Sequence, residues 1–257
     1  MKTRTFLPIL FAAIVILACT NDQFSETENN TPATLQKNWN QTELTTSLYN
    51  NLSVLSHHHI DAEKLRNIAL FKSVVKFRFT LGLNKNLELE IDVAGVDQNG
   101  TIVNSFTSVL NTNNNLKSSI NELQYSTYRY RALSNATTHL LPYKTAYTYI
   151  NKWQNAIQKK QIETLISYKG ERIRYYSLPK QIVIDMTSSK NVSAIALFLG
   201  INTNDKLTPV FIQKKQNGSL LLKAENNYLG TISDGDEPSD GEGNIYDFTE
   251  GCPDMCD

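Results

Sequence analysis

Apolar and polar residues alternate along two neighbouring segments in the first half of the chain, residues 75–81 and 87–93. A period of two residues is typical of a strand with one buried face and one solvated face. The two segments therefore predict an antiparallel hairpin. Pairing Phe79 with Leu89 would place basic side chains of one strand opposite acidic side chains of the other, and such pairs stabilise a ladder, so we expect this register.

Helical periodicity precedes the strands. Asp61 is a typical N-cap for a helix that extends to about Lys72, and Ser177 with Pro179 is a typical start for a second helix. Apolar residues at helical spacing also predict a long helix over residues 145–167 and a shorter one over residues 42–55. The segment 192–199 is apolar on both faces, so we expect a central strand there.

The two halves of the chain match each other when residues 60–103 are laid over residues 178–221, a shift of 118 positions. The matched turn motifs are Leu81-Gly82-Leu83-Asn84 with Leu199-Gly200-Ile201-Asn202, and Asn99-Gly100 with Asn217-Gly218. Between these motifs, an offset of two residues places Leu87 on Leu207. The match predicts an α+β fold of two repeated units, each a helix followed by antiparallel strands, related by pseudo-symmetry. Two unrelated hairpins that share common turn residues are the alternative.

The N-terminus has the pattern of an export signal. Lys2 and Arg4 precede an uncharged stretch over residues 5–18, which is too short to span a bilayer as a helix. Ile16-Leu17-Ala18-Cys19 then resembles the lipobox of bacterial lipoproteins. We expect Cys19 to carry the lipid and to become the first residue of the mature chain. An ordinary secretory signal with a chance cysteine is the alternative.

Composition limits the remaining choices. Hydrophobic residues make up 40% of the 257 residues, which supports a sizeable core and excludes wholesale disorder. The formal net charge is zero, which argues against a nucleic acid partner. Residues 234–257 contain nine acidic side chains and no basic one. The predicted segments are a signal peptide (1–18), a polar tether (19–40), a first α+β unit (41–110), a connector (111–143), a second α+β unit (144–230) and an acidic tail with two cysteines (231–257).

Cys252 and Cys256 are the cysteines that remain once Cys19 is lipidated. An exported compartment is oxidising, so we expect this pair to form a disulfide. Free or intermolecular thiols, and a metal or redox role, are the alternatives. The spacing differs from the C-x-x-C of redox sites, and two thiolates alone make a weak metal site, so we predict no metal and no cofactor.

An aromatic and basic stretch offers a candidate binding surface. Its members are Tyr147, Trp153, Tyr168, Arg172, Arg174, Tyr175 and Tyr176. Exposed aromatic rings could stack on sugars or on peptide side chains, whereas core packing is the alternative explanation. His57, His58 and His59 are consecutive, and only His57 and His59 would share a face of an extended strand. We interpret them as a polar approach to the helix at Asp61, and a metal site, which would need a further ligand that the sequence does not indicate, is the alternative.

The C-terminal part of the chain contains the motifs Leu199-Gly200-Ile201, Asn217-Gly218, Ile245-Tyr246-Asp247-Phe248 and the terminal Cys252-Pro253…Cys256. In these motifs, over about residues 145–257, the chain resembles a group of uncharacterised exported lipoproteins of Bacteroidetes-type bacteria. Asp254 stands where the group has a second proline. The group implies fold and location and transfers no activity.

The sequence therefore predicts a lipoprotein at the bacterial cell envelope, anchored through Cys19 in the outer membrane and facing the periplasm or the cell surface. We expect a non-catalytic binding or interaction module, with an envelope protein, a peptide or a glycan as its partner. A hydrolase of envelope or extracellular polymers and a purely structural envelope component are the alternatives. No catalytic residue can be assigned from the sequence.

Overall fold

The computed structural model describes residues 31–53, 57–111, 116–125, 139–222 and 244–247. Cys19, Cys252 and Cys256, and with them the predicted lipid anchor and disulfide, lie outside the described residues. The helices are α1 (Pro32–Gln41), α2 (Thr46–Ser53), α3 (Ala62–Ala69), α4 (Leu116–Tyr125), α5 (Tyr143–Gln158) and α6 (Lys180–Thr187). The prediction of an α+β fold with antiparallel strands is confirmed.

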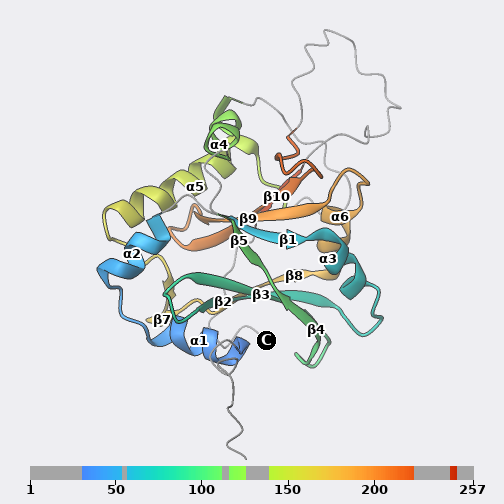
Figure 1. The fold of residues 1–257 in the computed structure, drawn as a ribbon, viewed down its shortest axis with the longest axis horizontal. Helices are drawn as coiled ribbons and strands as arrows, with labels where there is room; N and C mark the ends of the chain where they lie inside the picture. The colour runs from blue at the N-terminus through green and yellow to red at the C-terminus, as the bar shows by residue number, and fades with distance from the viewer. Residues whose placement is uncertain (1–30, 54–56, 112–115, 126–138, 223–243, 248–257) are drawn as a thin grey trace, which may run out of the picture.

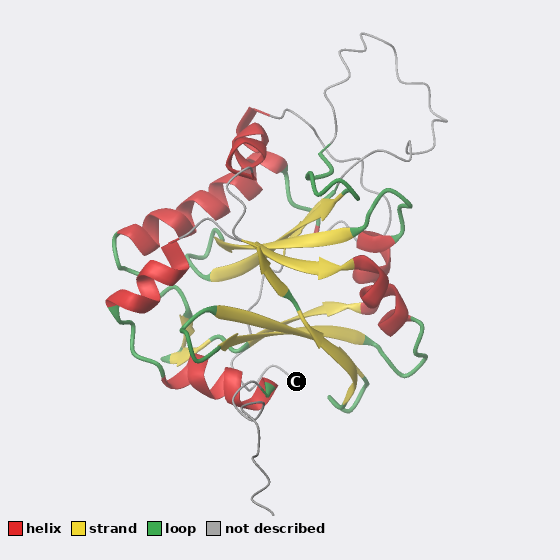
Figure 2. Cartoon of the chain, in the orientation of Figure 1, coloured by secondary structure: helices red, strands yellow, loops and turns green. Residues whose placement is uncertain are grey.

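Two antiparallel sheets lie face to face, with helices around them (Figures 1 and 2). The first sheet, sheet A, has the order β11-β10-β9-β1-β5, and the second, sheet B, has the order β4-β3-β2-β8. The strands of sheet A are β1 (His57–Asp61), β5 (Val109–Asn111), β9 (Ala194–Ile201), β10 (Leu207–Lys214) and β11 (Ile245–Asp247). Those of sheet B are β2 (Lys76–Leu83), β3 (Leu89–Val96), β4 (Ile102–Thr107) and β8 (Tyr175–Pro179), while β6 (Ser167–Tyr168) and β7 (Glu171–Arg172) form a separate hairpin.

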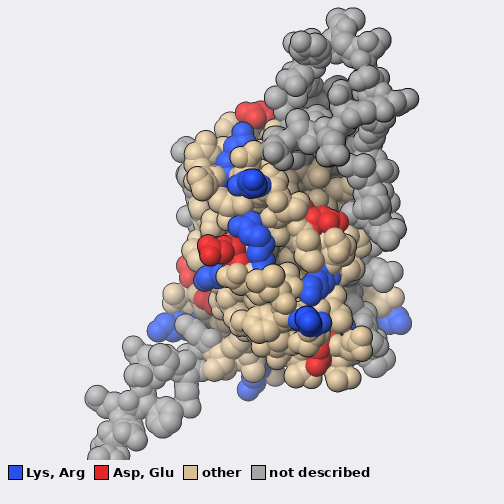
Figure 3. Space-filling model, turned by 90° about the vertical axis from the view of Figure 1, so that its right-hand side faces the viewer, with Lys and Arg blue, Asp and Glu red and all other residues tan. Residues whose placement is uncertain are grey.

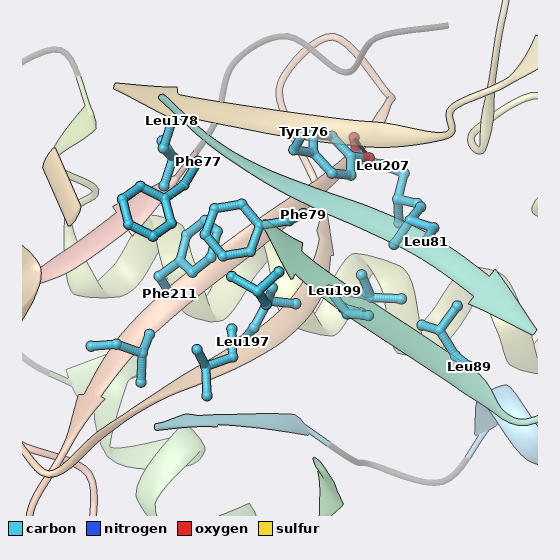
Figure 4. Close-up of a cluster of buried hydrophobic side chains, with 14 of the residues drawn as sticks. Phe77, Phe79, Leu81, Leu89, Tyr176, Leu178, Leu197, Leu199, Leu207 and Phe211 are labelled. Carbon is cyan, nitrogen blue, oxygen red and sulfur yellow. Dashed lines mark hydrogen bonds between the residues drawn. The ribbon is translucent and has the colours of Figure 1, made fainter. Parts of the chain in front are cut away.

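The core fills the space between the two sheets. Alternate residues of β2 and β3 point toward alternate residues of β9 and β10, as the cluster in Figure 4 shows. The rings of Phe79 and Phe211 meet across this layer with centroids 4.9 Å apart. Leu197 and Leu199 lie in the same cluster, and all eight residues of β9 are buried. The prediction of a central strand in this region is therefore confirmed, with bounds at residues 194–201 rather than 192–199.

Strands from the two predicted units pair with each other. β1 pairs with β9, and β8 pairs with β2, so each sheet contains strands from both halves of the chain. The bounds of β8, α6, β9 and β10 lie 118 residues after those of β1, α3, β2 and β3, and corresponding elements have equal lengths. No two-residue offset is needed, since Leu89 rather than Leu87 corresponds to Leu207 at the start of the strand.

The predicted register of the first hairpin is wrong. Phe79 pairs with Val93 rather than Leu89, and Leu83 pairs with Leu89. The turn decides the register, because the Asn84 side chain accepts hydrogen bonds from the backbone N–H groups of Asn86 and Glu88. These bonds occupy residues 84–88 in the turn, and their contribution exceeds that of exposed charge pairs across the ladder.

Several predicted boundaries also change. Residues 32–40, predicted as part of the tether, belong to α1, which buries Leu35 and Trp39 against sheet B. The predicted connector contains α4, and the predicted acidic tail contains β11. α5 ends at Gln158 rather than near residue 167, and Ser177 lies in β8 rather than at a helix cap. Asp61 caps α3 as predicted, since its carboxylate accepts from the N–H groups of Glu63 and Lys64.

Candidate functional site

A cavity of about 150 Å³ lies where one end of sheet A meets α2 and α5, the two helices on the left of Figure 1. Strands β1, β5 and β9 and the start of β3 also contribute to its wall. The apolar part of the lining includes Leu52, Leu89, Leu110, Ile150, Trp153 and Leu199. The polar part is Asn50, Asn51, His58, Glu88 and Gln154. The lining thus combines apolar and polar side chains, and a concave site of this kind can hold a small molecule.

His58 is the buried polar side chain of this wall, with 3% of its surface exposed. Its Nδ1 lies 3.1 Å from the hydroxyl oxygen of Ser108, which fixes the ring orientation. Burial lowers the pKa of His58 to about 3, so the imidazole is neutral at physiological pH. Nε2 of His58 has no hydrogen-bond partner among the described residues. A neutral imidazole in this position can form one further hydrogen bond.

The mouth of the cavity is held by the β2–β3 turn. The side-chain amide of Asn51, at the end of α2, donates to the carbonyl oxygens of Asn86 and Leu87. The side-chain amide of Asn84 donates to the exposed carboxylate of Glu88. The turn and α2 are therefore fastened together beside the opening, and Glu88 places a negative charge there.

A second buried histidine lies on the opposite face of the same strand. Nε2 of His57 is 3.1 Å from Nζ of Lys214, and its ring stacks on Phe198 with centroids 5.3 Å apart. An ammonium group can only donate, so His57 accepts through Nε2 and carries its proton on Nδ1, which has no partner. Burial, followed by the charge of Lys214, lowers the pKa of His57 to about 3. This pair stabilises the neutral histidine and lies outside the cavity lining.

The predicted binding surface does not form one exposed patch. Trp153 is buried and lines the cavity, whereas Tyr175 and Tyr176 are buried elsewhere, in β8. Tyr147 is partly buried against the cluster of α4 and α5, and Tyr168 is exposed beside Lys169. Of the seven residues, Trp153 is therefore the one that the structure brings to the cavity.

The two predicted arginines have structural contacts. Arg172 donates to the carbonyl oxygens of Trp39 and Thr42, each at 2.6 Å, and so fixes the end of α1. Glu163 lies 3.8 Å from the same guanidinium. Arg174 lies 4.0 Å from the carboxylate of Glu171. These contacts give both arginines a role in the fold, so neither side chain needs a ligand to explain its position.

Sequence reasoning did not identify His58 as part of a site. The alternation of the strand separates it from His57 and His59, as expected, but the strand pattern does not reveal that its side of the sheet borders a cavity. Long-range contacts determine this, since Leu52, Leu89 and Trp153 come from three other elements. The sequence around His58 therefore gives no indication that this side chain lines a cavity.

Among the described residues, no three or more His, Cys, Asp or Glu side chains gather in a way that could hold a metal ion. None of the described helices is long and apolar enough to cross a bilayer. The face formed by α3 and α6 carries several Lys and Arg side chains (Figure 3). Two of these basic groups have structural contacts, since Arg66 donates to the carbonyl of Thr187 and Lys180 to that of Phe71.

The chain was compared with protein-family models, with curated proteins and with solved structures. No family model, no curated protein and no solved structure matches it.

Proposed function

We propose that the chain is an exported lipoprotein of the Bacteroidetes-type group that it resembles, anchored through a lipid on Cys19, and that it works as a non-catalytic binding module at the cell envelope. The anchor is supported by the lipobox Ile16-Leu17-Ala18-Cys19 at the end of an uncharged stretch. The outer membrane is the proposed location. The ligand site in this proposal is the cavity between α2, α5 and sheet A.

The observation that carries the binding role is a cavity lined by both apolar and polar side chains, with a neutral, oriented imidazole in its wall. Catalysis by His58 as a general base would require a pKa near the working pH, and burial lowers that pKa to about 3. Glu88 is exposed and accepts a hydrogen bond from the Asn84 amide. The lining therefore offers hydrophobic contact and hydrogen bonding to a ligand. It favours binding over a hydrolytic role.

We also propose that the fold arose by duplication, with the halves related by a pseudo-twofold axis. The proposal is supported by the equal spacing of corresponding elements, and by the pairing of β1 with β9 and of β8 with β2, in which paired residue numbers add to the same total. The turns after β2 and β9 also have the same side-chain hydrogen bonds. Asn202 accepts from the N–H groups of Asn204 and Lys206, as Asn84 does from those of its own turn.

Close helix packing gives independent support for the duplication. An added Cβ at Gly82 would lie 2.5 Å from the Cβ of Leu35 in α1, and one at Gly200 would lie 2.9 Å from the Cβ of Tyr149 in α5. Gly82 and Gly200 are corresponding positions 118 residues apart. In each half, a glycine thus lets a helix approach the outer face of a strand at the same point.

Two measurements test the proposed function separately. Labelling of growing cells with a radioactive or clickable fatty acid should mark the wild-type chain and the Cys252→Ala control, and should leave the Cys19→Ala chain unlabelled. Native mass spectrometry of the full chain, extracted in mild detergent, should show a retained small molecule that is absent from a variant with a filled cavity, such as Leu110→Phe. Label on the Cys19→Ala chain would refute the anchor. Full retention of the small molecule in the filled variant would refute the cavity as its site.

A further inference from the structure

The position of His58 is one of the cavity-lining positions at which the two halves differ. Tyr176 is the residue that corresponds to His58, and each pairs with a corresponding residue, Tyr176 with Phe79 and His58 with Leu197. The hydroxyl of Tyr176 is buried and donates to the carbonyl oxygen of Leu207 at 2.8 Å. The second half therefore fills this part of its core with a phenol ring and closes it with a hydrogen bond.

In the first half the corresponding side chains line a cavity instead. Leu89 corresponds to Leu207, and both His58 and Leu89 belong to the cavity wall. An imidazole is shorter than a phenol and lacks its hydroxyl, so His58 does not provide the group that Tyr176 provides in the second half. The cavity is thus located where the two halves diverge.

The size and chemistry of the space restrict its occupant. A volume of about 150 Å³ is large enough for a molecule the size of one aromatic ring. The Nε2 of a neutral imidazole either donates or accepts, depending on the tautomer that Ser108 selects, and a hydroxyl group can complement both forms. A carboxylate ligand would meet the charge of Glu88 at the mouth and would lose its hydration inside.

From this geometry we infer that the cavity binds an uncharged small alcohol with an apolar body of about one ring, a phenol or an alcohol of similar size, with its hydroxyl on His58. This inference rests on the proposed binding function and specifies its ligand class. The ligand restores what Tyr176 supplies in the second half, namely apolar volume and a hydroxyl beside the start of the second hairpin strand.

The test uses phenol, toluene and benzoate, which share one ring and differ in a single substituent. Binding to the full chain in detergent is followed by two-dimensional NMR of the two tryptophan indole N–H groups. Trp153 lines the cavity, so its signal should move when a ligand enters. The indole of Trp39 donates to the carbonyl of Ile173 outside the lining, so its signal is the internal control for an intact fold.

The matched variant is His58→Tyr, which places in the first half the residue that the second half contains. Leu110→Phe, which fills the cavity from β5 at a partly exposed position, is the second variant. The cavity is filled in both variants, so any signal change that remains in them measures how each compound partitions into the detergent. An unmoved Trp39 signal identifies a variant that has folded.

Phenol should shift the Trp153 signal of the wild-type chain and bind about fivefold more tightly than toluene, the ratio expected for one hydrogen bond. Benzoate should leave the signal unchanged, and both variants should lose at least tenfold in phenol affinity. Equal binding of phenol and toluene would overturn the inference about the hydroxyl and leave the binding function standing. No shift by any of the three compounds would overturn this ligand class, and equal phenol affinity in the wild type and both folded variants would refute the cavity itself.

Discussion

Acid should destabilise the protein through His57, and the effect can be isolated with one substitution. Burial and the charge of Lys214 lower the pKa of His57 from 6.5 to about 3 in the folded chain. In the unfolded chain the imidazole returns to its ordinary pKa. Between these two values the unfolded state binds more protons than the folded state, so stability that is fully present above pH 6.5 is lost as the pH falls.

The magnitude follows from the pKa difference. At pH 5 the unfolded state gains about 2 kcal/mol from protonation of this one histidine, at roughly 1.4 kcal/mol per pH unit below 6.5. His58 contributes in the same direction, because its pKa is also about 3. Asp92 and Asp247 oppose both, because burial raises the pKa of each to about 6 and the folded state then gains protons first as the pH falls. Burial also lowers the pKa of His59, which acts in the same direction as His57 and His58. The pH dependence of the wild-type chain therefore combines the contributions of five groups.

The His57→Gln variant isolates the contribution of His57 from those of the other titrating groups. Glutamine retains an acceptor for Lys214 but does not titrate, and the charged or titratable neighbours Lys214, His58, His59 and Asp61 remain in place. Free energies of unfolding from urea titrations at pH 7.5 and pH 5.0 give the pH effect for each chain. The wild type should lose about 2 kcal/mol more than His57→Gln between these pH values. Equal losses would refute the burial and neutral state assigned to His57.

Three further outcomes are expected. Gly82→Ala and Gly200→Ala should each lower the free energy of unfolding by about 1–3 kcal/mol, because the new methyl group would meet α1 or α5 at under 3 Å; denaturant midpoints within error of the wild type would contradict the close packing. Arg172→Ala should cost about 2–4 kcal/mol, because it removes two partly buried hydrogen bonds from a charged donor to carbonyl oxygens at the end of α1, and Arg172→Lys should recover only part of this in the same titration. Amide exchange in residues 32–41 should rise in Arg172→Ala, and unchanged protection there would show that Arg172 does not hold α1.

Much of the fold follows from local pattern. Alternation over residues 75–81 and 87–93 and the cap at Asp61 have local physical causes, so the sequence alone predicted these elements. The hairpin register was missed because the side-chain bonds of Asn84 outweigh surface charge pairing. α1 was missed because its sequence is polar on average, and only Leu35 and Trp39 are buried in the assembled fold.

The candidate site was less accessible to sequence reasoning. Aromatic composition drew attention to Trp153 but also to Tyr175 and Tyr176, which are buried in sheet B. The importance of His58 depends on its contrast with Tyr176, and that contrast exists only once the two residues are placed at corresponding positions of paired strands. An empty volume is a property of tertiary packing and leaves no local pattern in the sequence.

A ligand in the cavity beside His58 can be observed in a crystal structure of the chain grown with phenol. Phenol density is expected between His58 and Trp153, with the phenol oxygen within hydrogen-bond distance of Nε2 of His58, and no such density is expected in the His58→Tyr chain. A wild-type cavity that contains only water, or that side chains have closed, would contradict this expectation.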